Sequence, residues 1–466
     1  MRKSILALTL ASFLFSSCAF YAKPTNVSIK YPSAFKEKLS KYEQAYYTPK
    51  DQNLYNHWWK TFNDKTLDYY VDLALKNNTN YLIALKNIEL SKAYALENSS
   101  VLFPSFNLNA SATKEKLSKR TPTGRFFNIP PYTTYNLSVN ASYEIDLFAK
   151  ALNAYRYYKE NVKISKEEAK AIKNALIMNA VNNYYQIVEN AHYIGLLEKE
   201  INIAKKNLEL AKTNYKAGLT SYQSVDQAKS SLLNLEQTLE TYKAQRKVLV
   251  NTFAYLLGKY PEDFKFSIYG TLPRHFAIPK AIPSTVLITR PDIKEAMYNV
   301  ISNAYQKKIA LANFFPSFNL TGSYGYQSQK LNELVTQPSI SWNFGLDILT
   351  PILNWNQNLG LYKASKVELA QSILNYRQTV LNAFKEVDDA IAQYKTDDIN
   401  YKSLKKSYQA ALDQYRIALA NYRAGLTPYS SLLTYKTNLI ESKKALLNQK
   451  LKLIQDISSL YNVLGY

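Results

Sequence analysis

Four stretches of the chain alternate apolar and polar residues at every second position. This period predicts strands that have one apolar and one polar face. Each stretch is close to the length of a membrane-spanning strand, and aromatic residues lie near several of the ends. Half-buried strands of a soluble protein would alternate in the same way, so the pattern alone leaves both interpretations open. The four stretches are residues 105–112, 136–147, 317–326 and 339–348.

Long segments between these stretches lack the residues that usually end a helix. Residues 149–216 and 355–423 contain no proline and one glycine each. At about 1.5 Å per residue, each would form a helix of roughly 100 Å, which cannot bury itself in one compact domain. Apolar residues recur within them at spacings of three and four, which predicts coiled-coil packing in a projecting, oligomeric tube. Four helices of about half that length are predicted at residues 67–103, 222–257, 284–315 and 429–464.

One short motif occurs twice, at an offset of 207 residues (425 − 218). Residues 214–225 read NYKAGLTSYQSV, and residues 421–432 read NYRAGLTPYSSL. A second glycine follows each motif, at Gly258 and Gly465, and keeps the same offset. The chain is therefore an internal tandem repeat, and each motif is expected to be the turn of an antiparallel helical hairpin.

Each turn contains residues that typically end one helix and begin the next. Gly218 and Gly425 are expected in the left-handed conformation that closes a helix. We expect Thr220 and Thr427 to be the N-caps of the returning helices. Pro428 would then occupy the first helical position of the second return.

The N-terminus has the layout of a secretory signal peptide. A basic start is followed by an apolar run at residues 4–15, which is too short to span a membrane, and then by small residues. Cys18, the sole cysteine of the chain, comes directly after them. This arrangement resembles the bacterial lipobox, which implies that Cys18 becomes the acylated, palmitate-bearing first residue. The alternative is a free cysteine buried within the signal peptide.

The repeat and the signal peptide together divide the chain into five parts. Prolines at positions 24, 32 and 49 favour an extended leader after the lipid anchor. We expect the signal peptide at residues 1–17, followed by the lipid-anchored leader and an equatorial segment at 18–66. The first repeat is expected at 67–258, an equatorial linker at 259–283 and the second repeat at 284–466. Equatorial denotes the region around the middle of the long helices.

The chain carries a formal net charge of +22, but nothing in it predicts a nucleic-acid partner or an enzyme. The lysines are spread along the predicted helices, so we interpret them as solvated helix faces. The sequence contains no P-loop, no GxGxxG or GxSxG motif and no metal-binding spacing of His and Cys, and we expect no cofactor. Glu144 and Asp146 are paired acids on one predicted strand. A catalytic pair is one interpretation of them, and a solvated lining is the favoured one.

Several short motifs complete the pattern. PSFNL stands at residues 104–108 and 316–320, each time at the start of a predicted strand. SYEIDLF at 142–148, LITRPDI at 287–293 and LTPIL at 349–353 accompany the two AGLT turns. Together these motifs resemble the outer-membrane efflux lipoproteins of the TolC/OprM (NodT) type, and the resemblance covers nearly the whole mature chain.

The resemblance implies a mainly α-helical fold with a membrane β-barrel. Proteins of this type are homotrimers in which each subunit gives four strands to a shared barrel of twelve. A long helical tunnel extends from the barrel into the periplasm, and the linker and both termini form a belt around it. The chain would be lipid-anchored in the bacterial outer membrane.

The function that the resemblance implies is that of an exit duct. The duct would passively conduct substrates from a tripartite efflux complex to the exterior, with a periplasmic adaptor protein and an inner-membrane pump of the RND type as partners. One alternative is the exit duct of a type I protein-secretion system. Another is a structural coiled-coil protein of the envelope, which would have no use for four alternating strands. Between drug, metal and protein cargo the sequence does not decide.

The resemblance also assigns residues to the two ends of the duct. Relatives commonly ring the closed tip with aspartates, whereas Ser431, Thr434 and Ser224 stand at the matching positions here. The expected tip and gate residues are Gly218, Thr220, Ser224, Asp226, Gly425, Thr427, Ser431 and Thr434. The expected lumen residues are Asn140, Glu144, Asp146, Asn319, Asn343 and Asp347, and Leu137, Val139, Leu320 and Phe344 are expected to face lipid.

Overall fold

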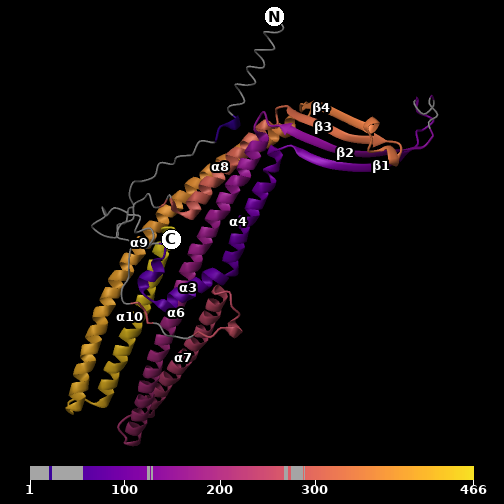
Figure 1. Cartoon of the computed structure of the whole chain (residues 1–466). Coiled ribbons are helices and arrows are strands. Elements are labelled where there is room, and N and C mark those ends of the chain that lie inside the picture. The colour runs from indigo at the N-terminus through magenta and orange to yellow at the C-terminus, as the bar shows by residue number, and fades with distance from the viewer. Residues whose placement is uncertain are drawn as a thin grey trace. The chain divides into compact units, whose positions relative to one another are not determined.

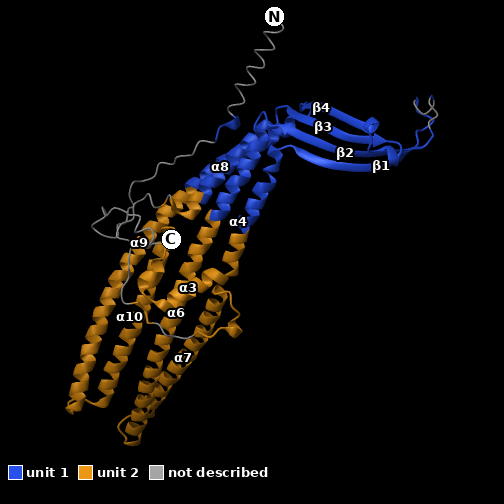
Figure 2. Cartoon of the chain, viewed as in Figure 1, with its two compact units in different colours: residues 1–29, 87–166, 295–377 blue, residues 30–86, 167–294, 378–466 orange. Residues whose placement is uncertain are grey.

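A computed structural model (Figure 1) describes residues 20–23, 56–122, 126, 130–266, 271–273, 287 and 289–466. Cys18, the predicted signal peptide and most of the predicted leader lie outside the described residues. The chain divides into two compact units, which Figure 2 shows in different colours. Unit 1 comprises residues 1–29, 87–166 and 295–377, and unit 2 comprises residues 30–86, 167–294 and 378–466. Each unit therefore contains segments from both predicted repeats.

Unit 1 contains one antiparallel sheet of four strands in the order β1-β2-β3-β4 (Figure 1). The strands are β1 (Ser105–Glu115), β2 (Tyr132–Ile145), β3 (Ser317–Ser328) and β4 (Ile340–Leu349). All four strands predicted from the alternating pattern are confirmed. Strand β2 begins four residues earlier and ends two residues earlier than predicted. Among the described strands, β1 and β4 each have one partner only and so form the two edges of the sheet.

Four long helices form two hairpins. Helix α6 (Lys150–Lys216) is followed by α7 (Tyr222–Leu256), and α9 (Trp355–Arg423) is followed by α10 (Tyr429–Val463). Every one of these bounds lies within one residue of its prediction, so the mainly helical class is confirmed. None of the helices in the described ranges combines the length and the apolar character that a membrane crossing requires.

The single helix predicted at residues 67–103 is wrong. The structure has α3 (Lys65–Asn77), α4 (Thr79–Glu97) and a short 3-10 helix (Ser100–Leu102) in its place. Asn78 separates α3 from α4 with an extended backbone, and its side chain accepts a hydrogen bond from the Tyr81 N–H at 3.1 Å. The Asn78 amide also donates to the Leu256 carbonyl at 3.0 Å. A buried asparagine with a distant partner can thus break a helix that contains no proline or glycine.

Helix α8 (Pro291–Ala312) is shorter than the predicted segment at 284–315. It begins at a proline, whose missing N–H is not needed at the first helical position. Arg290, directly before this proline, is 7% exposed. The partners of its guanidinium are Asp292, Glu386 on α9 and the Val463 carbonyl at the end of α10, at 2.7, 2.7 and 2.6 Å. This network fixes the start of α8 against the middle of α9 and the end of α10.

The core of unit 2 is rich in aromatic rings. Trp58 and Trp59 lie in a 3-10 helix (Trp58–Phe62) and are buried. The ring of Trp58 stacks on Tyr461 of α10 with a centroid distance of 5.1 Å. Asp64 caps the start of α3 and also accepts a hydrogen bond from the Tyr184 hydroxyl of α6 at 3.0 Å. These contacts attach the segment before α3 to both hairpins.

Candidate functional site

One face of the sheet in unit 1 carries continuous rows of apolar side chains. Residues that pair directly across an antiparallel sheet share a face. One such row consists of Leu108, Val139, Tyr324 and Trp342. Leu108 and Trp342 are 74% and 72% exposed, and large exposed apolar faces indicate contact with lipid or with another protein. The register also places the residues that were predicted to face lipid on this face, namely Leu137, Val139, Leu320 and Phe344.

The opposite face of the same sheet is polar. One row across it consists of Asn107, Asn140, Ser323 and Asn343, and another of Glu144, Asn319 and Asp347. The sheet therefore brings together five of the six residues that were predicted to line the lumen. Asn319 stands between Glu144 and Asp347 in the register, so these two acids are not directly paired.

Asp146, the sixth predicted lumen residue, has a different place. It follows the end of β2, and its carboxylate accepts hydrogen bonds from the N–H groups of Ala151 and Leu152 at 3.1 and 2.8 Å. These groups belong to the first turn of α6, where N–H groups lack partners within the helix. A carboxylate there is also favoured by the helix dipole. Asp146 therefore caps α6, and an acid just before a predicted helix start was the sequence signal for this role.

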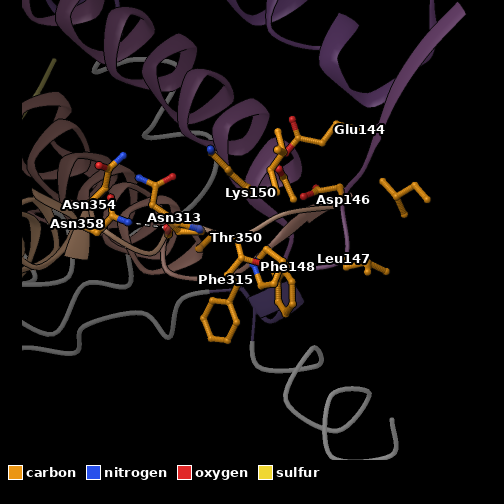
Figure 3. A pocket seen from close by; sticks show the side chains of 16 residues that line it. Glu144, Asp146, Leu147, Phe148, Lys150, Asn313, Phe315, Thr350, Asn354 and Asn358 are labelled. Atoms are coloured by element: carbon orange, nitrogen blue, oxygen red, sulfur yellow. Dashed lines mark hydrogen bonds between the residues drawn. The ribbon is translucent and has the colours of Figure 1, made fainter. Parts of the chain in front are cut away.

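A polar cavity of about 350 Å³ lies in unit 1 where the strands give way to helices (Figure 3). Its lining includes two carboxyl groups, one ammonium group and three amides, from Glu144, Asp146, Lys150, Asn313, Asn354 and Asn358. The Asn358 amide donates to the Asn313 carbonyl at 2.8 Å. This mixture suits contact with water and polar solutes. In the described parts of the chain, no group of three or more His, Cys, Asp or Glu could hold a metal ion.

The two AGLT turns in unit 2 close their helices in the same way. Gly218 and Gly425 both have a φ of +72°, which confirms the predicted left-handed conformation. The Gly218 and Gly425 N–H groups donate to carbonyls three residues back, at 2.9 and 3.0 Å. The next N–H groups, those of Leu219 and Leu426, donate to carbonyls five residues back, at 2.9 Å each. This pair of bonds is the Schellman motif.

The predicted N-caps of the returning helices are wrong. The residues at these positions are Ser221 and Pro428 rather than Thr220 and Thr427, and neither makes a side-chain capping bond. Pro428 is thus the cap and not the first helical residue. The backbone stays extended through Ser221 and Pro428, with ψ of 159° and 157°, so each cap lies one residue later than predicted. At Thr427 the following proline favours this extended geometry.

The other predicted gate residues lie on the first two turns of the returning helices. Ser224 and Asp226 belong to α7, and Ser431 and Thr434 belong to α10. Ser224 and Ser431 are half-buried, whereas Asp226 and Thr434 are exposed. The structure therefore brings the predicted residues of each tip together within its own hairpin.

A buried ion cluster joins the two hairpins, and the sequence reading missed it. Lys444 of α10 binds Glu200 of α6 and, at 2.8 Å, Glu441 of its own helix. The side chains of Lys444 and Glu200 are 7% and 9% exposed. Burial disfavours the charged ammonium, but its hydrogen bonds to both glutamates outweigh burial and raise the pKa of Lys444. No local pattern marks such a pair, because its members are 244 residues apart.

A second buried polar cluster lies between α9 and α10. The Gln449 amide donates to the Asp397 carboxylate at 2.6 Å, and the Asp456 carboxyl lies beside the same carboxylate. Burial and the neighbouring Asp397 raise the pKa of Asp456 to about 7. On α6, burial raises the pKa of Glu189 to about 7 as well. These carboxyl groups therefore titrate near neutral pH.

Comparisons with known proteins extend over most of the chain. A family model described as outer membrane efflux protein matches residues 70–259 and 282–466. Toxin and drug export protein A of Aggregatibacter actinomycetemcomitans is 26% identical over 353 residues, which are 74% of each chain. The antibiotic efflux pump outer membrane protein ArpC of Pseudomonas putida is 25% identical over 385 residues, 81% of this chain and 78% of ArpC. The structure of the CmeC outer membrane channel of Campylobacter jejuni aligns with a TM-score of 0.84 and 26% identity, over 95% of this chain and 94% of CmeC.

Proposed function

The chain belongs to the outer membrane efflux protein family, and on that premise we propose that it is the exit duct of a tripartite efflux system. The duct passively conducts solutes from a pump complex to the exterior. The observation that carries the proposal is the register of the sheet, which separates an exposed apolar face from a polar face on all four strands. A membrane-spanning strand needs this separation, because one face meets lipid and the other meets water.

The duct is a homotrimer in this proposal. Within a bilayer, every backbone N–H and C=O needs a partner, so an open sheet edge is not tolerated. In the single chain, β1 and β4 are both edges. Three copies that pair β4 of one subunit with β1 of the next would close a barrel of twelve strands. Helix α4 also exposes apolar residues that a neighbouring copy would cover, among them Leu90 and Leu96.

The proposed partners follow from what this chain lacks and from where its hairpins end. It carries no nucleotide-binding motif, so the energy for export comes from an inner-membrane pump, which we propose to be of the RND type. A periplasmic adaptor protein links that pump to the tips at Gly218 and Gly425. Cys18 carries the lipid anchor in the outer membrane. The five-part division of the chain, from signal peptide to second repeat, is part of the same proposal.

The matched variants Val139→Arg and Asn140→Arg test the assignment of the two faces. These residues are neighbours in β2 and lie on opposite faces of the sheet. Arginine at Val139 should cost roughly 2–4 kcal/mol near the bilayer midplane, because it places a charge in lipid. Arginine at Asn140 should leave assembly intact and lower the single-channel conductance. The measurements are the yield of outer-membrane trimer and conductance in planar bilayers, and equal yields for the two variants would refute the membrane assignment.

The gate of the proposed duct lies at the start of α10. Ser431 and Thr434 are small neutral residues there, and the N-terminal end of a helix is itself partly positive. The double variant Ser431→Asp, Thr434→Asp should therefore increase the cation selectivity of the reconstituted channel. The double variant Asn438→Asp, Asn448→Asp adds the same charge at exposed positions farther along the same helix and serves as the control. If both double variants show the wild-type reversal potential, the constriction lies elsewhere.

A further inference from the structure

A short N-terminal segment is seated where the strands and helices of unit 1 meet. Phe20, the first described residue, is 6% exposed. Its ring meets Phe148 and Phe315 edge-on, with centroid distances of 5.9 and 5.2 Å. Phe148 and Phe315 stack on each other at 4.6 Å. An aromatic socket of two stacked rings therefore holds the side chain of Phe20.

The backbone of the same segment is bound as fully as the ring. Three successive carbonyls, those of Phe20, Tyr21 and Ala22, each accept a hydrogen bond from a different side chain. The donors are Asn153 at 3.2 Å, Arg156 at 2.8 Å and Lys308. The Tyr21 hydroxyl in turn donates to the carbonyl of Asp146, the residue that caps α6. A segment that merely crossed the surface would not have each of its carbonyls paired in sequence.

The socket draws its residues from both repeats. Phe148, Asn153 and Arg156 come from the end of β2 and the start of α6, in the first repeat. Lys308 and Phe315 come from α8 and the residues before β3, in the second repeat. The segment thus contacts two parts of the chain that are far apart in the sequence, since Phe148 and Phe315 are separated by 167 residues (315 − 148). Its docking ties these parts together at one end of the sheet.

The socket also restricts the position of the residue that the lipid would modify. Cys18 precedes Phe20 by two residues. Two residues of extended chain span at most about 7 Å. A lipid on Cys18 would therefore emerge beside the end of the sheet and not at an arbitrary point along the helices.

We propose that this socket is an intramolecular docking site for the mature N-terminus. Its occupant is the segment Phe20–Ala22, its anchor is the Phe20 ring, and its effect is to hold the acylated Cys18 at the periplasmic ends of the membrane strands. The inference rests on the proposed function, because it takes the sheet as the membrane-spanning part. A docked segment stabilises the contact between the two repeats. When the segment is undocked, the socket no longer restricts the position of the lipid.

Limited chymotrypsin digestion of the full-length, detergent-solubilised protein tests the docking. Cleavage after Tyr21 requires the segment to leave the socket, so its rate follows the undocked population. Phe20→Ala should increase this rate roughly ten- to hundred-fold, from the loss of one buried aromatic ring. Arg156→Ala, which changes the socket and not the segment, should increase it several-fold. Cleavage after Phe253, which is fully buried, serves as the internal reference for global unfolding.

The control is Phe126→Ala, which removes a phenylalanine that is 83% exposed. This variant should be cleaved after Tyr21 at the wild-type rate. Uptake of labelled palmitate, measured in the same strains, should be equal in all variants, because the socket positions the lipid and does not attach it. If Phe20→Ala and Arg156→Ala both keep the wild-type cleavage rate, the docking site is refuted. Failure of the channel in planar bilayers would instead refute the proposed function and would leave the cleavage result unaffected.

Discussion

The two hairpins of unit 2 are alike in their turns and different in their burial. In the first hairpin the rings of Tyr215 and Tyr222 meet at 5.3 Å, and in the second Tyr422 and Tyr429 meet at the same distance. Each pair is related to the other by the offset of 207 residues (422 − 215, 429 − 222). The glycine between them has a φ of +72° in both copies. At the turn, the two hairpins are therefore equivalent.

The equivalence extends along the helices away from the turn. In the first hairpin the Asn190 amide donates to the Tyr242 carbonyl at 3.3 Å. At the positions 207 residues later, Gln449 donates to Asp397 at 2.6 Å. The direction of donation is reversed, but the same two positions meet in both hairpins. The repeat has thus kept the register of its helix pair while changing the side chains that hold it.

Burial separates the two returning helices. Helix α7 buries Val225, Phe253 and Ala254, whereas α10 buries eleven residues, among them Ile440 and Lys444. The position equivalent to Ile440 is Leu233, which is 54% exposed. The difference arises because α10 packs on α6 through Leu433 and Ile440. A repeated sequence therefore fixes the conformation of a hairpin but not which helices pack against it.

The largest contrast between the hairpins is expected at Lys444 and its equivalent Gln237 (444 − 207). Lys444→Ala leaves Glu200 buried without its counter-charge, which should cost about 3–5 kcal/mol in the free energy of unfolding. Gln237 is exposed, so Gln237→Ala should change that free energy by less than about 0.5 kcal/mol. Denaturant unfolding followed by far-UV circular dichroism measures both.

The double variant Lys444→Met, Glu200→Leu sharpens this contrast. It replaces the buried ion pair with apolar side chains of similar size and should restore most of the lost stability. A Lys444→Ala variant as stable as Gln237→Ala would show that α10 does not pack on α6 in the assembled protein.

An equal effect is expected at the two turn glycines. A Cβ added at Gly218 or Gly425 would meet no atom within 4 Å, so Ala at either position should cost only the strain of a positive φ. That strain is about 1–2 kcal/mol and should be the same for Gly218→Ala and Gly425→Ala. Thermal unfolding of the two variants, measured side by side, checks this expectation. A difference larger than about 1 kcal/mol would mean that the assembly treats the two turns differently.

The smallest contrast concerns pH and lies at Asp456 of the second hairpin, whose equivalent in the first is Leu249 (456 − 207). Asp456 has a pKa of about 7 in the folded protein, above the ordinary aspartate value of about 3.9, so the folded state binds its proton more tightly than the unfolded state. Its contribution to stability is present in acid and is lost as the pH rises through about 7. The equivalent of its partner Asp397 is Asn190, which does not titrate.

The variant Asp456→Asn tests this contrast. It should flatten the fall in melting temperature between pH 5.5 and pH 8, an effect on the order of 1 kcal/mol or less after solvent screening. Glu189, whose pKa is also about 7, contributes the same pH dependence to wild type and variant and cancels in their comparison. If the melting temperatures of the two proteins change with pH in parallel, Asp456 is not the titrating group.

The elements whose conformation is set within a few residues follow from the sequence alone. Gly218 and Gly425 adopt the left-handed conformation because glycine has no Cβ that opposes it. The alternation in residues 136–147 produced a strand with two distinct faces, because successive side chains of a strand point to opposite sides. The lengths of α6 and α9 followed from the absence of proline. The repeat, the four strands and the two hairpins were accordingly predictable.

Tertiary packing accounts for the features that depend on distant partners. Asn78 ends α3 with help from Leu256, and Lys444 is buried because Glu200 meets it on another helix. The seat of Phe20 between Phe148 and Phe315 likewise has no trace in the local sequence. Periodicity and backbone preferences act over a few residues, whereas the burial of a charge or a ring is decided by groups that folding brings from more than a hundred residues away. For that reason the sequence specified both hairpins alike, whereas packing buried α10 of the second hairpin more than α7 of the first.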